Sequence, residues 1–343
     1  MNRNNVMKFS SLMSLNLLMG GGRKPEPDVL RGLAIILVVL GHSCATLTEK
    51  IVTYSFHMPL FFFITGLFLI HKEEPFGAFF KKRVKSLLVP LLAFGVILST
   101  YSIILGYVME RPLPIFAKYI GILVNTRHGD YGGSLWFLPS LFLVEMLLYI
   151  IHKTCSSSYW MLFISIVCAV AGVLVNQQIG QGLPWSLDIS LLCVFFTALG
   201  YVLKDWIWKE HHVMSYMFTL VFFVISIYYN YLHIGSCVDL FSCRIGNPML
   251  FYVSAICGIY LTIGMSKVLC KRTDHIGLVL YYGQNSLIVY ALHFLFVQGV
   301  NLSLRWIPIG WVAGLLQTLI ILLIQIPLIN LVNSKFRWMT GKF

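Results

Sequence analysis

The 343-residue chain is 58% hydrophobic and only 11% charged, with a mean hydropathy of +0.81. This composition excludes an ordinary water-soluble domain and indicates an integral membrane protein. The formal net charge of +12 does not indicate nucleic-acid binding, because the charges fall in short loops between apolar runs and form no basic stripe.

A bilayer core about 30 Å thick requires about 20 apolar residues of helix. That template predicts an all-α, polytopic bundle of about ten transmembrane helices, over residues 30–48, 53–71, 86–108, 134–152, 159–176, 187–203, 213–233, 247–266, 279–300 and 309–333. The stretch "IFAKYIGILV" between the third and fourth spans is too short to cross and predicts an interfacial or re-entrant helix.

Most of the 25 basic residues fall in alternate loops, which places both termini in the cytoplasm by the positive-inside rule. The outer segments then hold only Lys50, Arg111, Lys118, Arg127, Arg244 and Arg305. We expect an N-terminal cytoplasmic tail over residues 1–27, which is not a cleaved signal peptide. A membrane domain then covers 28–334, and a second cytoplasmic tail covers 335–343.

The eight cysteines include no C-x-x-C pair and no zinc spacing, so we predict no metal. Most of them lie in apolar runs, where packing is their expected role. Cys237 and Cys243 lie instead in a polar outer loop. They could form a disulfide if that loop faces an oxidising compartment.

Arg31 and His42 stand near opposite ends of the first span, "DVLRGLAIILVVLGHS". Eleven residues turn a helix through about 1100°, which is only about 20° past three revolutions. The two side chains therefore share one helix face, roughly 16 Å apart along the axis. Arg31 alone could be a snorkelling anchor, but the pairing with His42 favours a functional site.

His57 lies near the outer end of the second span, at about the depth of His42. Two spans joined by so short a connection should be neighbours, so we expect both imidazoles to face one cavity. A single buried histidine is as often a satisfied core residue as a functional one, whereas two at matched depth favour a site.

Three further positions are possible supporting residues. Glu145, inside a span, should pair with a basic residue or orient a histidine. His293 should line the cavity or hydrogen-bond a neighbouring helix. Trp136 fits an interfacial aromatic belt, with stacking on a sugar as the less favoured alternative.

Five stretches in order, "DVLRGLAIILVVLGHS", "HMPLFFFITG", "FFKKRVKSLLVPLL", "GGSLWFLPSLFLVEMLL" and "GQNSLIVYALHFLF", resemble the integral membrane acyltransferase family 3. The nearest likeness is to its fucose 4-O-acetylase-like branch. The resemblance runs from about residue 28 to the last span, and it is the ordered set of motifs that makes it specific.

The resemblance implies transfer of an acyl group, usually acetyl from cytoplasmic acetyl-CoA, to a hydroxyl of a cell-envelope glycan. Arg31 and His42 match the arginine and histidine of the family's R-x10-H motif. The family's R-x-x-R motif matches less well: "KKRVKS" offers Lys82 and Lys85 at that spacing, and three residues after Arg83 comes Ser86. We therefore expect Arg31, Lys82, Arg83 and Lys85 to be candidates for binding the phosphates of CoA.

These observations predict an O-acetyltransferase of the bacterial inner membrane, with His42 as general base and His57 supporting it. Its partners would be membrane lipids and a glycan or lipid-linked sugar acceptor, and not nucleic acid. A transporter or flippase could use the same buried charges, but no internal repeat is evident. A non-catalytic subunit of a glycan-assembly complex would not need the histidines. The sequence leaves the oligomeric state open.

Overall fold

The computed structural model describes residues 25–43, 46–69, 74–127, 135–155, 157–179, 182–271, 276–303 and 310–342. Residues 1–24, most of the predicted N-terminal tail, lie outside this set. Over the described residues the protein is helical and contains no strand, as the sequence predicts.

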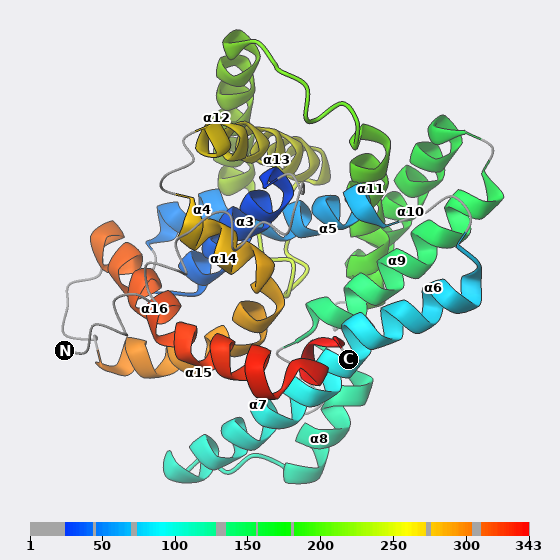
Figure 1. The fold of residues 1–343 in the computed structure, drawn as a ribbon. Helices are drawn as coiled ribbons and strands as arrows, with labels where there is room; N and C mark the ends of the chain where they lie inside the picture. Colours follow the sequence, from blue (N-terminus) through cyan, green and yellow to red (C-terminus); the bar gives the residue numbers. More distant parts are fainter. Residues whose placement is uncertain are drawn as a thin grey trace.

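The helices follow each other in chain order, joined mostly by short connections (Figure 1). They are α3 (Glu26–His42), α4 (Leu47–Tyr54), α5 (His57–Phe68), α6 (Phe76–Arg83), α7 (Val89–Val108), α8 (Ile115–Val124), α9 (Phe137–Thr154), α10 (Ser158–Ile179), α11 (Leu187–Leu203), α12 (Val213–Ile234), α13 (Pro248–Lys271), α14 (Gly277–Gln284), α15 (Ser286–Ser303) and α16 (Trp311–Lys335). A π-helical turn (Val84–Leu88) joins α6 to α7, and short 3-10 turns precede α11 (Pro184–Ser186) and follow α16 (Arg337–Thr340).

Eight helical segments of the described chain are long and apolar enough to cross a bilayer. They coincide with eight of the ten predicted spans. The other two predicted spans correspond to α3, which has 17 residues, and to the α14–α15 region, which is broken at Asn285. The chain is a multi-pass membrane protein.

The first predicted span is shorter in the structure than in the sequence analysis. α3 ends at His42, and α4 begins after Thr46, whose hydroxyl accepts a hydrogen bond from the Glu49 amide. The Glu49 carboxylate in turn accepts one from the Thr46 amide at 2.6 Å. This capping box starts a new helix within the stretch that hydropathy alone assigns to one span and its outer connection.

α3 is the central helix of the bundle (Figure 1). It packs against α5, α13, α14, α15 and α16. α12 lies at the periphery, where most of its apolar side chains are exposed, as expected for a surface that faces lipid. The predicted interfacial segment forms α8, a short helix packed against α7.

Helices α5 and α11 bring their backbones into close contact at two glycines. A Cβ atom built on Gly66 would lie 2.0 Å from the carbonyl oxygen of Thr197, and one on Gly200 would lie 2.1 Å from that of Phe63. Small residues allow this backbone contact between membrane helices, which fixes α5 and the histidine at its start.

We predict that Gly200→Ala destabilises the bundle by roughly 1–3 kcal/mol, because the added methyl group forces two backbones apart. The measurement is the thermal unfolding midpoint of the purified protein in detergent. Gly77→Ala is the matched control, since a Cβ there would meet no atom within 4 Å. An unchanged midpoint for Gly200→Ala would contradict this account of the packing.

Candidate active site

Two cavities lie at opposite ends of α3. The first, of about 660 Å³, contains Arg31 in its wall, and the second, of about 430 Å³, contains His42. We call them the arginine cavity and the histidine cavity. Met58 and Tyr290 line both cavities, so these two side chains form a shared wall between them. One end of α3 therefore contributes Arg31 to the arginine cavity, and the other end contributes His42 to the histidine cavity.

The charged lining of the arginine cavity is largely paired. Arg31 Nη1 lies 3.1 Å from Asp28 Oδ1, and its guanidinium stacks over the Phe68 ring, 5.1 Å from the centroid. Arg83 Nε lies 3.2 Å from Glu145 Oε2, close enough for an ion pair although these two atoms form no hydrogen bond. Of the two roles that the sequence left open for Glu145, the structure shows the ion pair.

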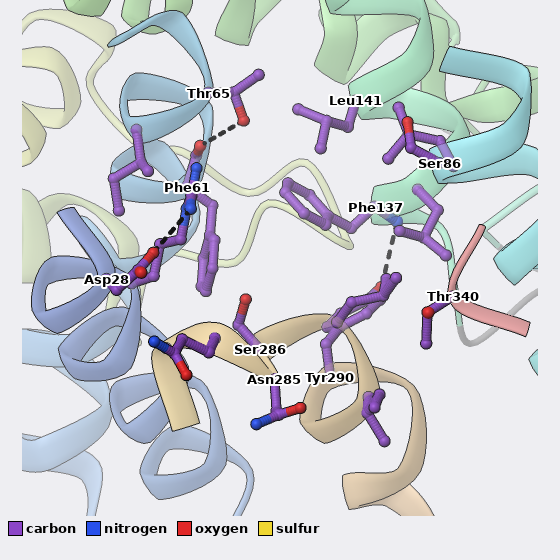
Figure 2. Close-up of a pocket in the computed structure, with 18 of the residues that line it drawn as sticks. Asp28, Phe61, Thr65, Ser86, Phe137, Leu141, Asn285, Ser286, Tyr290 and Thr340 are labelled. Carbon is purple, nitrogen blue, oxygen red and sulfur yellow. Dashed lines mark hydrogen bonds and ion pairs between the residues drawn. The ribbon is translucent and has the colours of Figure 1, made fainter. Parts of the chain in front are cut away.

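Interruptions in regular helix shape the same cavity. The π-helical turn before α7 places Ser86 and Leu87 in its wall, beside Arg83 at the end of α6. Pro90 has no amide hydrogen for the Ser86 carbonyl, so the regular ladder cannot run through this point. On the opposite side, the break at Asn285 presents polar groups of Gly283–Ser286 to the cavity (Figure 2).

Three histidines gather at the other end of α3. Each donates from Nδ1 to a backbone carbonyl three or four residues earlier in the chain: His42 to Val38 at 2.8 Å, His57, at the start of α5, to Thr53 of α4 at 2.7 Å, and His293 to Tyr290 at 2.6 Å. A carbonyl oxygen can only accept, so Nδ1 carries the proton in each ring. The neutral imidazoles therefore keep the lone pair on Nε2, where a base would accept a proton.

The three rings differ in access to the cavity. His42 and His57 both line it, as their matched depth predicts, with Tyr54 close to both rings. His57 is 3% exposed, whereas His42 is only half-buried. His293 is completely buried and packs edge-on against His42, with ring centroids 5.0 Å apart. His42 is the histidine that a molecule entering the cavity reaches most easily.

The rest of the histidine cavity combines aromatic rings and charges that sequence reasoning did not connect. Trp136 and Phe241 line it together, with ring centroids 6.2 Å apart. Asp239 lines it as well, and its carboxylate accepts hydrogen bonds from the Phe241 amide and the Ser242 hydroxyl. Nothing in the sequence places the loop that carries Asp239 and Phe241 in one cavity with His42, because the contact depends on long-range packing.

The described cysteines, including Cys237 and Cys243 of this loop, are free thiols. Burial raises the pKa of the Cys243 thiol to about 12. Cys243 therefore stays protonated at neutral pH and is a poor nucleophile.

A buried ion pair lies in the wall of the histidine cavity. Arg127, which lines the cavity, donates two hydrogen bonds to Asp188 at the start of α11, at 2.7 and 2.6 Å. Both side chains are at most 3% exposed. From the sequence, Arg127 is predicted only as one of the basic residues of the outer segments. The signal available was Asp188, the one charged residue of the sequence between Lys153 and Lys204.

The remaining basic residues predicted for the donor lie outside the arginine cavity. Lys82 pairs loosely with Glu74 at 3.7 Å and is half-exposed. Lys85 belongs to the π-helical turn but does not line the cavity. Of the "KKRVKS" cluster, Arg83 and Ser86 are the residues that reach it.

These features define a class of protein: a polytopic helical membrane protein with a polar cavity at each end of one central helix. The Acyltransferase domain family matches residues 24–329. Because the match spans most of the chain, the protein belongs to acyltransferase family 3, a family of membrane acyltransferases. No curated protein and no solved structure matches the chain.

We predict that breaking the Arg127–Asp188 pair costs about 3–5 kcal/mol of folding free energy, because the remaining charge stays buried without its partner. Arg127→Gln, Asp188→Asn and the double variant would be compared by unfolding in detergent. The double variant should lose less folding free energy than the two single variants lose together. Lys271→Gln is the control, since Lys271 pairs with Glu210 at an exposed site and should cost less than about 1 kcal/mol. Equal effects at the two pairs would contradict the prediction.

Proposed function

We propose that this protein is an O-acyltransferase that moves acetyl from acetyl-CoA in the arginine cavity to a sugar hydroxyl in the histidine cavity. One observation carries the proposal: the two cavities meet at Met58 and Tyr290, between a guanidinium at one end of α3 and an imidazole at the other. An acyl group attached to a donor on one side would have to pass only this shared wall to reach the base.

The arginine cavity suits a phosphorylated, elongated donor. Its charged mouth can hold phosphates, and its apolar depth, which includes Phe61, Ile64, Leu138 and Leu141, suits the thioester arm. In this arrangement Arg31 orients the donor. The Arg83–Glu145 pair supports the wall.

The histidine cavity suits a carbohydrate acceptor. Trp136 and Phe241 offer aromatic faces, and the Asp239 carboxylate can accept hydrogen bonds from hydroxyl groups. His42 Nε2 would accept the proton of the attacking hydroxyl as its oxygen bonds to the thioester carbonyl carbon. The C–S bond then breaks, and the proton passes from His42 to the departing thiolate. The buried His293 and His57 rings would hold His42 in position.

We further propose that the Arg31 end faces the cytoplasm of a bacterial inner membrane, with both termini on that side. The placement of most basic residues supports this orientation. The donor would then bind from inside and an envelope glycan or lipid-linked sugar from outside. The fucose 4-O-acetylase-like likeness supports acetyl as the acyl group.

We predict that His42→Ala lowers acetyl transfer by at least about 100-fold, because proton removal by a positioned base contributes that much or more. The assay uses purified protein in proteoliposomes, with radiolabelled acetyl-CoA on the Arg31 side and an envelope glycan extract on the other. His233→Ala is the matched control, because His233 is exposed at the end of α12 and lines neither cavity. Full activity in His42→Ala would exclude His42 as the base. Label that never leaves CoA with wild-type protein would favour the transporter or the accessory subunit.

The shared wall generates a second prediction, about acyl-chain length. Met58→Ala should widen the passage and raise kcat/KM for butyryl-CoA relative to acetyl-CoA by roughly tenfold, since accommodating extra methylene groups is worth about 1–3 kcal/mol. Met214→Ala, on the exposed face of α12, is the control. The same donor preference in wild type and Met58→Ala would show that the shared wall does not limit the length of the acyl group.

A further inference from the structure

The C-terminal segment is part of the arginine cavity and not a free tail. After α16 ends at Lys335, the chain turns through the 3-10 helix Arg337–Thr340 and packs against α7. Thr340 and Lys342 then line the arginine cavity. In Figure 2, Thr340 projects from this segment across the cavity from Asp28. The family match ends at residue 329, so this part of the wall lies outside the matched residues.

Packing fixes the segment in place. Met339 is 7% exposed and belongs to the main hydrophobic core. Gly341 has a φ of +73°, and a Cβ atom at this position would lie 2.1 Å from the Lys85 carbonyl oxygen. Only glycine combines this backbone conformation with so close an approach. The position of Lys342, the next residue, is therefore set by the fold.

The charges of the cavity give Lys342 a distinct role. Five charged side chains line the cavity: Asp28, Arg31, Arg83, Glu145 and Lys342. The two arginines are each paired with one of the two carboxylates. Lys342 has no carboxylate partner among the described residues, so it supplies the net positive charge of this lining. It lines the cavity and is also exposed to solvent, so a hydrated anion entering the cavity can contact it.

A general alternative is that Lys342 is one more cytoplasmic basic residue with no ligand. Lys335 represents that case on the same segment, because it is exposed at the end of α16 and lines no cavity. Lys342 differs from Lys335 because the packing of Met339 and Gly341 holds Lys342 at the cavity.

We propose that Lys342 is a donor-binding residue that contacts a phosphate group of the acyl-CoA at the mouth of the arginine cavity. This inference rests on the proposed function, since it assumes that the donor binds in that cavity. Lys342, from the C-terminal segment, would then bind the donor together with Arg31, in the cavity that Arg83 also lines. The thioester end of the same donor would lie at the opposite end of the cavity, beside Met58 and Tyr290.

The test compares two donors that differ in their phosphates. For Lys342→Ala we expect KM for acetyl-CoA to rise roughly tenfold, the size of a lost charge-assisted hydrogen bond, with kcat nearly unchanged. KM for acetyl-pantetheine, which has no phosphate, should stay at the wild-type value. Lys342→Arg should retain most of the affinity, and Lys335→Ala should behave as wild type with both donors.

A second variant tests position separately from charge. Gly341→Ala keeps Lys342 but displaces it, so it should also raise KM for acetyl-CoA and leave acetyl-pantetheine unaffected. Equal KM values for acetyl-CoA in Lys342→Ala, Lys335→Ala and wild type would overturn the inference, as would an equal rise for both donors.

Measurements on the wild-type protein distinguish an error about Lys342 from an error about the proposed function. Wild type that transfers acetyl normally, while Lys342→Ala matches Lys335→Ala, overturns the role of Lys342 alone. Wild type that neither transfers acetyl nor gains thermal stability on addition of CoA overturns the donor site, and the role of Lys342 with it.

Discussion

The arrangement depends on one constraint: polar groups on a helix buried in a membrane bundle need partners or water. α3 carries Arg31 and His42 on one face, and neither can be left against lipid. At its start, Asp28 and the Phe68 ring accommodate the guanidinium. At its end, the Val38 carbonyl and a cavity accommodate the imidazole. The helices around α3 cover its apolar faces, and the two polar cavities lie at its ends.

Several interruptions of regular helix lie beside the two cavities. The π-helical turn before α7 and the break between α14 and α15 both open onto the arginine cavity. Near the histidine cavity, the left-handed residues Trp185 and Ser186 precede α11, whose Asp188 accepts hydrogen bonds from Arg127. In a bilayer, such unpaired backbone is tolerated only where protein or water covers it. The interruptions in the helices are therefore consistent with sites that have to admit polar molecules.

The shared wall of Met58 and Tyr290 gives the proposed reaction its geometry. Tyr290 is held by a long contact in which the Phe137 amide donates to its hydroxyl, at 3.4 Å, and Met58 is an adaptable, unbranched side chain. A closed wall would keep water and protons from leaking between the cavities. A small acyl group would have to displace only side chains at this point and no helix. Reactivity and membrane sealing would then depend on the same two residues.

Much of the bundle could be predicted from hydropathy, because a helix needs about 20 apolar residues to cross the hydrocarbon core of a bilayer. Helix breaks were harder to predict. The capping box at Thr46 and the break at Asn285 are short local signals inside strongly apolar runs. The periodicity of α3 also placed Arg31 and His42 on one face, since that relation depends only on local helix geometry.

The sequence by itself determined the membrane class, the helical spans and the polar face of the central helix, because these follow from local composition and spacing. Tertiary structure alone decided that Glu145 pairs with Arg83, that Asp188 pairs with Arg127 and that Asp239 and Phe241 reach the histidine cavity. It also decided that the C-terminal segment returns to place Lys342 in the same cavity wall as two already paired arginines. These contacts join residues far apart in the chain, and the packing of helices against one another, which no local pattern encodes, brings them together.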